Sequence, residues 1–347
     1  MKKILMWVGL VLVFLLLVFG IVFRNEITTI ATTKKLNDKP FYEMNYRGDY
    51  ALDKILKKGV DNDQELADFA TKQLLHGIPV KIKVPNLGCT TFNAITPDGD
   101  KTFARNFDLD NAPVMVVRTK PKNDYESISV VDPGLIGIKA EGMNKPMGRL
   151  MTLVAPYIPL DGMNEKGLSV AVLKLQDENT NQNTGKPGIN TTVAIRMILD
   201  KAKTTDEAVN LLKKYDMHSS STATYHFQIA DKRGKSVVVE YVNNQMKVLP
   251  SDKNYQVATN FYLSPEKYGQ GKGQDRYKIA TEKLEDQKGI LTPEQSMDLL
   301  KATHLEDKGD NSKAMVTQWS AVYQQDKLQL DIATGHNYKK VYHFNVH

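Results

Sequence analysis

The chain opens on an uninterrupted apolar stretch, Ile4 to Phe23, which follows two lysines and ends at Arg24. These twenty residues, at about 1.5 Å each, span a hydrocarbon core of roughly 30 Å, whereas a cleavable signal peptide has an apolar region of about 7–15 residues. The lysines favour a cytoplasmic amino terminus. We expect residues 1–23 to be an uncleaved signal anchor that crosses the cell membrane once, through residues 4–23, and leaves the rest extracytoplasmic. A secreted protein with an atypical signal peptide is the alternative.

Residues 24–88 are expected to form a polar linker followed by a small helical region. Apolar residues recur at helical spacing in two groups: Leu52, Ile55 and Leu56, then Leu66, Phe69, Ala70 and Leu74. His76-Gly77 and Pro79 end the second helix, and residues 80–88 are a turn-prone approach to the segment that follows.

A strand, a turn and a returning strand follow. Cys89 to Ile95 reads as the first strand, residues 96–100 as the turn and Lys101 to Asp108 as the second strand. In such a hairpin Arg105 returns to within one or two residues of Cys89 and shares its face.

Beyond the hairpin the pattern shows strands, then paired helices, then strands. Strands are expected at 114–118, 127–131, 150–155, 168–175, 222–230, 236–242, 315–323 and 328–333, and a turn at 161–167. Helices are expected at 191–203, 204–215 and 276–284 and from 293, with caps at Asn190, Thr204 and Thr292. Because strands and helices are grouped and do not alternate, the order favours an α+β fold.

Composition narrows the functional classes. The net charge of +6 comes from 46 basic and 40 acidic residues scattered along the chain, without the basic stripe of a nucleic-acid-binding protein. Seven histidines show no zinc-ligand spacing, and no glycine-rich phosphate loop is present. We therefore expect no nucleic-acid partner, no cofactor and no metal.

One cysteine, Cys89, stands in 347 residues, directly after Gly88. A single cysteine forms no internal disulfide. Its thiol is therefore either a buried side chain with a packing role or a reactive group. A free thiol has a pKa of roughly 8.5 and needs a base or a nearby cation to act as a nucleophile. Arg105 on the same face supplies such a cation.

The sequence Cys89-Thr-Thr-Phe with Ala104-Arg105-Asn106-Phe107-Asp108 resembles the opening of the choloylglycine hydrolase superfamily of N-terminal-nucleophile (Ntn) hydrolases. This group includes bile salt hydrolases, penicillin V acylases, acid ceramidase and N-acylethanolamine acid amidase. Gly88 and the long upstream segment resemble the self-cleaving members. The resemblance implies a four-layer α-β-β-α sandwich over residues 89–347, with 24–88 as linker and helical propeptide that the mature protein can keep bound.

The resemblance also implies a mechanism. Cys89 attacks the Gly88 carbonyl, and cleavage frees an α-amine whose pKa of about 7.7–8.0 suits a base. The thiolate then cleaves a linear amide of a small N-acyl substrate through a thioester. Arg105 steadies the thiolate or a substrate oxygen, and Asp108 holds the α-ammonium.

Two downstream matches complete the expected site. The first, Thr259-Asn260, resembles the family's strand end, where Asn260 donates to the oxyanion. The second, Asp275-Arg276, resembles the helix start of the ceramidase branch, so Arg276 is the second active-site arginine. Alone, each residue has a plainer interpretation: a strand-terminating asparagine and a solvated helix residue.

One position departs from the bile salt hydrolase pattern. The chain matches Asn164-Glu-Lys-Gly-Leu168, but Lys174 stands where those enzymes place the oxyanion asparagine. No site role is assigned to Lys174. The acyl group is left open among N-acyl amino acids, bile salts, penicillin V, acyl homoserine lactones and N-acylethanolamines.

Three alternatives stay open. An amine that replaces water at the thioester would make the protein an acyltransferase. A chain that keeps the fold without the chemistry would be a catalytically silent cell-surface binding protein. A papain-like pairing of Cys89 with His226 or His304 is the third, although nothing around Cys89 resembles those families' signatures.

Overall fold

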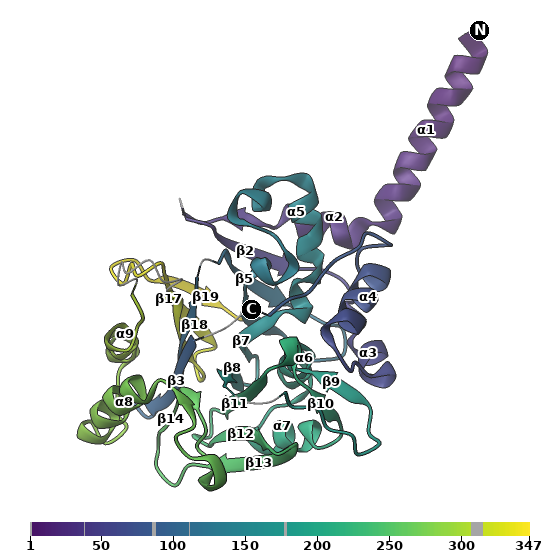
Figure 1. Cartoon of the computed structure of the whole chain (residues 1–347). Coiled ribbons are helices and arrows are strands. Elements are labelled where there is room, and N and C mark those ends of the chain that lie inside the picture. Colours follow the sequence, from purple (N-terminus) through teal and green to yellow (C-terminus); the bar gives the residue numbers. More distant parts are fainter. Residues whose placement is uncertain (1, 38, 85–87, 111, 177–178, 307–314) are drawn as a thin grey trace.

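The computed structural model describes residues 2–347 except 38, 85–87, 111, 177–178 and 307–314, so part of the predicted 80–88 approach lies outside the described residues. Two large sheets dominate it (Figure 1). The smaller, six-stranded sheet is wholly antiparallel. Its strands, in spatial order, are β14 (Gln256–Ala258), β3 (Gly88–Ile95), β4 (Lys101–Leu109), β17 (Val316–Gln324), β18 (Gln329–Thr334) and β19 (Tyr342–Asn345).

The larger sheet has nine strands and is antiparallel except where β2 lies parallel to β5. Its strands, in spatial order, are β1 (Lys34–Lys35), β2 (Phe41–Tyr46), β5 (Val114–Thr119), β6 (Ser127–Val131), β7 (Pro159–Asn164), β8 (Ser169–Leu175), β11 (Thr224–Ala230), β12 (Ser236–Val242) and β13 (Gln245–Pro250). Two short pairs, β9 (Gly188–Asn190) with β10 (Asp216–His218) and β15 (Asn260–Phe261) with β16 (Gly271–Lys272), flank the sheets.

Helices cover each sheet. On the larger sheet, α6 (Thr191–Lys201) packs against β7 and β8, and α7 (Thr205–Leu212) packs against β11 and β12. On the smaller sheet, α8 (Gln274–Asp286) contacts β3 and β14, and α9 (Pro293–Ala302) contacts β4 and β17. The predicted α+β class is confirmed, and the predicted caps form at Asn190, Thr204 and Thr292.

The two faces of the β3–β4 hairpin have different neighbours. Phe92 and Ala104 point toward the α8–α9 layer and share its core with Ala280 and Leu284. The opposite face, which carries Cys89, lies against the nine-stranded sheet, where β3 contacts β8. The alternation of the strand therefore places the cysteine between the two sheets.

The predicted hairpin is confirmed in detail. Cys89 lies opposite Phe107, and Thr91 lies opposite Arg105, so Arg105 shares the face of Cys89. The turn closes at Gly99, whose φ of +90° suits glycine. The length of the turn fixes this register. A slip of one residue would turn the cysteine toward the α8–α9 layer.

Two expectations need correction. The strand predicted at 150–155 is instead helix α5 (Pro146–Met151) followed by a 3-10 segment (Thr152–Tyr157). A short continuous apolar run does not distinguish a buried strand from a buried helix. The turn predicted at 161–167 begins later, because β7 extends to Asn164.

The segment between α1 (Lys2–Val22) and the cysteine packs against the rest of the chain. The helices α3 (Leu52–Lys58) and α4 (Asp63–Gln73) form as predicted and bury their apolar faces. The expected polar linker, however, contains helix α2 (Arg24–Ala31) and strand β2, which pairs with β5 over six residues. Buried β2 side chains include Phe41 and Met44.

The N-terminal apolar stretch forms helix α1 (Lys2–Val22), which projects away from the rest of the chain (Figure 1). Residues Ile4–Val22 have a mean hydropathy of 3.0 and none of that segment is buried. By length and composition this helix suits either a membrane span or a signal sequence.

We predict that Met44→Ala lowers the free energy of unfolding by about 2–5 kcal/mol, because Met44 is fully buried in β2 and the substitution leaves a cavity. Denaturant unfolding measures this change. Lys57→Ala, on the exposed side of α3, is the control and should change stability by less than about 0.5 kcal/mol. Equal stability of Met44→Ala and wild type would show that β2 adds nothing to the sheet.

Candidate active site

The sulfur of Cys89 is fully buried between the two sheets. Its Sγ atom accepts a hydrogen bond from Nη2 of Arg105 at 3.2 Å and donates to the Val172 carbonyl oxygen of β8 at 3.6 Å. The thiol therefore has polar neighbours from both sheets and is not walled in by apolar side chains.

Arg105 joins the two sheets. Its Nη1 donates to the Leu160 carbonyl oxygen at 2.5 Å and lies 3.2 Å from Oδ2 of Asp161, both in β7. The guanidinium also lies over the rings of Phe107 and Trp319, at 5.0 and 5.9 Å from their centroids. These contacts hold the guanidinium of Arg105 in the position from which it donates to Sγ of Cys89.

Asp161 is a site residue that sequence reasoning missed. Its carboxylate accepts hydrogen bonds from Nε1 of Trp319, at 3.1 Å, and from the Tyr323 hydroxyl, so the ion pair with Arg105 is fully enclosed. The sequence placed Asp161 in an expected turn, where an aspartate is ordinary. Only the packing of β7 against β4 and β17 reveals its role as the partner of Arg105.

Arg276 reaches the cysteine from the first turn of α8. Its Nη1 donates to the Cys89 carbonyl oxygen at 2.5 Å and to Oγ1 of Thr90 at 2.8 Å, and it lies 3.4 Å from Oδ2 of Asp108. Its Nη2 donates to Oδ1 of Asn260 at 2.9 Å. Arg276 thus holds the main chain of the cysteine.

Asn260 binds the preceding peptide unit, Gly88–Cys89. Its Oδ1 accepts the Cys89 N–H at 2.7 Å, and its Nδ2 donates to the Lys174 carbonyl oxygen at 2.9 Å. In this uncleaved chain Asn260 therefore orients the Gly88–Cys89 amide. Lys174 takes part through its main chain, and burial of its half-buried side chain lowers the pKa of the ammonium.

Asp108 faces Gly88 across the hairpin. Its Oδ1 accepts a 2.5 Å hydrogen bond from Oγ1 of Thr317, which sequence reasoning also missed. A β-carbon at position 88 would lie 2.9 Å from both Cβ and Oδ2 of Asp108. The residue before the cysteine has no room for a side chain unless Asp108 moves.

All six predicted site residues lie together: Gly88, Cys89, Arg105, Asp108, Asn260 and Arg276. The two histidines considered for a papain-like pair have other partners. His226 is fully buried between Glu240, at 3.1 Å, and the Thr259 carbonyl oxygen, at 2.7 Å, while His304 pairs with Glu306. Within the described residues, the hydrogen-bond partners of the sulfur are an arginine and a carbonyl.

The charged groups around the Cys89 sulfur sum to zero when the thiol is neutral. Two guanidinium groups, Arg105 and Arg276, face two carboxylates, Asp108 and Asp161. Burial raises the pKa of Cys89 to about 11, although Arg105 and Arg276 act to lower it. Burial also raises the pKa of Asp108 and of Asp161 against the pull of their arginines. In the uncleaved chain the cysteine is a neutral thiol at pH 7.

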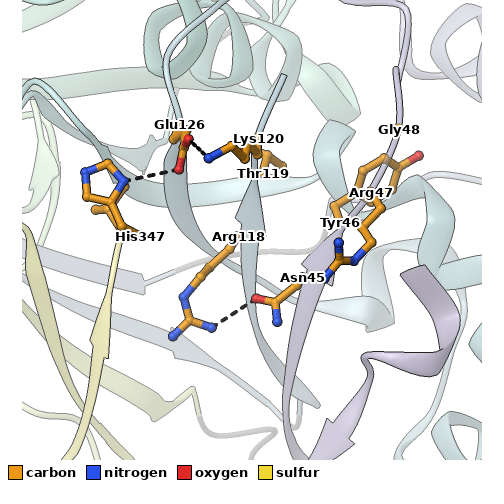
Figure 2. Close-up of a pocket in the computed structure, with 10 residues that line it drawn as sticks. Asn45, Tyr46, Arg47, Gly48, Arg118, Thr119, Lys120, Glu126 and His347 are labelled. Carbon is orange, nitrogen blue, oxygen red and sulfur yellow. Dashed lines mark hydrogen bonds and ion pairs between the residues drawn. The ribbon is translucent and has the colours of Figure 1, made fainter. Parts of the chain in front are cut away.

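A cavity of about 560 Å³ lies elsewhere, between β2, the end of β5 and the C-terminus (Figure 2). Several of its charged groups have partners. Arg118 donates to Oδ1 of Asn45 at 3.2 Å, and Glu126 accepts from Lys120 and, at 3.1 Å, from His347. No residue of the cysteine site lines it, so its size alone does not mark it as a reaction site.

Comparison with known proteins identifies the family of the chain. The pattern of the linear amide C-N hydrolases, choloylglycine hydrolase family, matches residues 89–291, a span that begins at Cys89. The chain belongs to this family. Family members of this kind are linear amide hydrolases, so the protein is an enzyme of that class.

One curated relative and two solved structures are similar to parts of the chain. Penicillin V acylase from Pectobacterium atrosepticum is 35% identical over 111 residues, a match that covers 29% of each chain. Conjugated bile acid hydrolase from Clostridium perfringens has a similar fold, with a TM-score of 0.55 at 18% identity over 74% of this chain and 92% of that one. Penicillin V acylase from Agrobacterium tumefaciens gives 0.52 at 19% identity, over 71% and 83%. The fold matches that of Ntn hydrolases.

We predict that Arg105→Gln lowers the free energy of unfolding by about 3–5 kcal/mol, because it leaves Asp161 buried without its counter-charge. Adding Asp161→Asn should recover part of that loss. Denaturant unfolding of both single variants and the double variant measures the coupling. Lys278→Gln, which breaks an exposed pair with Glu282, is the control and should change stability by less than about 0.5 kcal/mol. Additive losses in the double variant would contradict the ion pair.

Proposed function

We propose that the protein is an extracytoplasmic Ntn hydrolase that cleaves itself between Gly88 and Cys89 and then hydrolyses a linear amide through a Cys89 thioester. One observation carries the proposal. The N–H, carbonyl oxygen and sulfur of Cys89 are held by Asn260, Arg276 and Arg105 respectively. Three separate side chains thus orient one buried residue. A cysteine that served only for packing would not need this orientation.

Self-cleavage begins with attack of Sγ on the Gly88 carbonyl carbon. The carbon–nitrogen bond breaks, the nitrogen takes a proton as the new α-amine of Cys89, and water then hydrolyses the Gly88 thioester. The absence of a side chain at Gly88 leaves that carbonyl open to the sulfur and lets the strand lie close to Asp108. Asn260 fixes the plane of the amide through its N–H.

Cleavage changes the charge balance that keeps the thiol neutral. A thiolate in the uncleaved chain would add one negative charge to two arginines and two aspartates that already balance. Hydrolysis yields an α-ammonium on Cys89 and a carboxylate on Gly88. Once the Gly88 carboxylate has moved away, the ammonium adds one positive charge beside the sulfur, so the thiolate–ammonium pair of Cys89 is compensated. In this proposal Asn260, whose Oδ1 accepts the Cys89 N–H in the intact chain, and Asp108 accept hydrogen bonds from that ammonium.

Cleavage also separates the preceding segment from Cys89. The segment before the cysteine is held against the later chain, with Lys83 N–H on the Leu135 carbonyl oxygen at 2.8 Å and Val84 N–H on Oγ of Ser221 at 2.9 Å. Once the bond is cut, this end can leave without unfolding β3. We infer that the uncleaved chain is an inactive precursor with a closed site.

The remainder of the N-terminal segment stays bound after cleavage in this proposal. Strand β2 is hydrogen-bonded to β5, and the Tyr50 hydroxyl donates to Oδ2 of Asp200 at 2.5 Å within the buried core. Because α1 belongs to the same segment, the catalytic part, residues 89–347, remains attached to whatever α1 enters. We propose that α1 is a membrane anchor with the enzyme on the extracytoplasmic side.

In the hydrolytic step, the thiolate attacks the acyl carbonyl of the substrate and the α-ammonium gives its proton to the departing amine. Water, deprotonated by the α-amine, then releases the acid. Arg105 steadies the thiolate, and Arg276 keeps the Cys89 main chain in place. The named relatives, penicillin V acylase and conjugated bile acid hydrolase, make penicillin V and conjugated bile acids the first substrates to test.

Assay of the full-length protein in detergent tests this function. Penicillin V, a glycine-conjugated bile acid and N-acyl amino acids serve as substrates, and mass spectrometry measures released acid and amine. We predict that Cys89→Ala lowers the rate at least about 1,000-fold, because the nucleophile is lost. Lys278→Gln, far from the sulfur on the surface of α8, should keep full activity. Hydrolysis that survives Cys89→Ala would refute the proposal.

A further inference from the structure

Two histidines and a glutamate meet on the α9 side of the smaller sheet, outside the cysteine site. His304 lies just after α9, Glu306 two residues on and His336 in the turn after β18. One ligand atom from each lies within 4.8 Å of the other two. The two imidazole rings stand edge to face with centroids 5.1 Å apart.

Each imidazole already has one nitrogen fixed by the main chain. Nδ1 of His304 bonds the Lys301 carbonyl oxygen, which leaves Nε2 free to face Oε1 of Glu306 at 2.7 Å. His336 bonds the main chain of Thr317, and its Nε2 is buried without a hydrogen-bond partner among the described residues. Metal-binding histidines characteristically show this arrangement, in which the second nitrogen fixes the ring and its tautomer.

We propose that His304, Glu306 and His336 form a binding site for a divalent transition-metal ion of the Zn²⁺ class, with a fourth position open to water. Two imidazoles and one carboxylate are a known zinc donor set. Bonds of about 2.0–2.2 Å in a tetrahedral centre place ligand atoms roughly 3.3 Å apart. The three ligand atoms lie within 4.8 Å of one another, so a bound ion would draw them closer together.

The backbone supports the site. His336 has φ of +61°, a left-handed conformation that a non-glycine residue keeps only when its surroundings impose it. The same turn is held by Lys39, whose ammonium donates to the Gly335 carbonyl oxygen at 2.8 Å.

The proposed metal would stiffen the support of Asp108. Leu305, between two of the ligands, receives the Thr317 N–H on its carbonyl oxygen at 2.9 Å and donates its own N–H to Oγ1 of Thr317 at 2.8 Å. The same Thr317 hydroxyl donates to Asp108. A bound ion would therefore fix the chain that orients an active-site carboxylate without touching substrate.

Metal binding by the full chain tests the proposal, with Zn²⁺ alone and Co²⁺ alone as probes. Calorimetry and elemental analysis give affinity and stoichiometry, and the visible spectrum of Co²⁺ reports its geometry. All variants carry Cys89→Ala as well, because a thiol binds zinc. The ligand variants are His304→Gln, Glu306→Gln and His336→Asn, the last because asparagine tolerates the left-handed conformation.

We expect one tightly bound ion per chain and affinity at least about 100-fold weaker in each ligand variant. His343→Gln, an exposed histidine paired with Asp331, should bind as the parent does. Glu306 is 67% exposed, so Glu306→Gln keeps the fold and tests the site even if His336→Asn does not fold. The absence of stoichiometric binding, or its loss only in His347→Gln at the other candidate cluster of Glu126, Glu165 and His347, would overturn the proposal.

Discussion

A single enclosed guanidinium joins Cys89 to the rest of the molecule. Arg105 belongs to the smaller sheet, yet its hydrogen bonds go to the sulfur on one side and to β7 of the larger sheet on the other. A buried charge requires a partner, so the position of Arg105 is fixed by Asp161, and Asp161 by Trp319 and Tyr323. The packing of the two sheets therefore determines the position of Arg105 relative to the Cys89 thiol.

The same enclosure raises the pKa of the Cys89 thiol in the intact chain. Its surroundings contain equal numbers of cationic and anionic groups, and the sulfur is fully buried, so a further charge there is not compensated. In our proposal, a new amino terminus supplies the missing positive charge, and the upstream strand β2 stays in the sheet because its contacts do not involve the broken bond. Activation then needs one broken peptide bond and no change of fold.

The sequence predicted the features that depend on residues close together along the chain. The hairpin, the caps and the placement of Arg105 beside Cys89 follow from a turn of known length, and resemblance added Asn260 and Arg276. Asp161 and Thr317 were missed because an aspartate in a turn and a threonine in a strand are ordinary until two distant strands meet around them. Strand β2 was missed because polar residues interrupt it, and His304 and His336 because 32 positions separate them in the sequence.

The central claim is that Cys89 becomes the first residue of a working chain. Amino-terminal sequencing of the purified protein, combined with intact mass under native and denaturing conditions, tests it most directly. We predict a new terminus at Cys89, two fragments that separate only on denaturation, and a single uncut chain in Cys89→Ala. An active wild-type protein that remains one uncut chain, or one cut at another bond, would contradict the account.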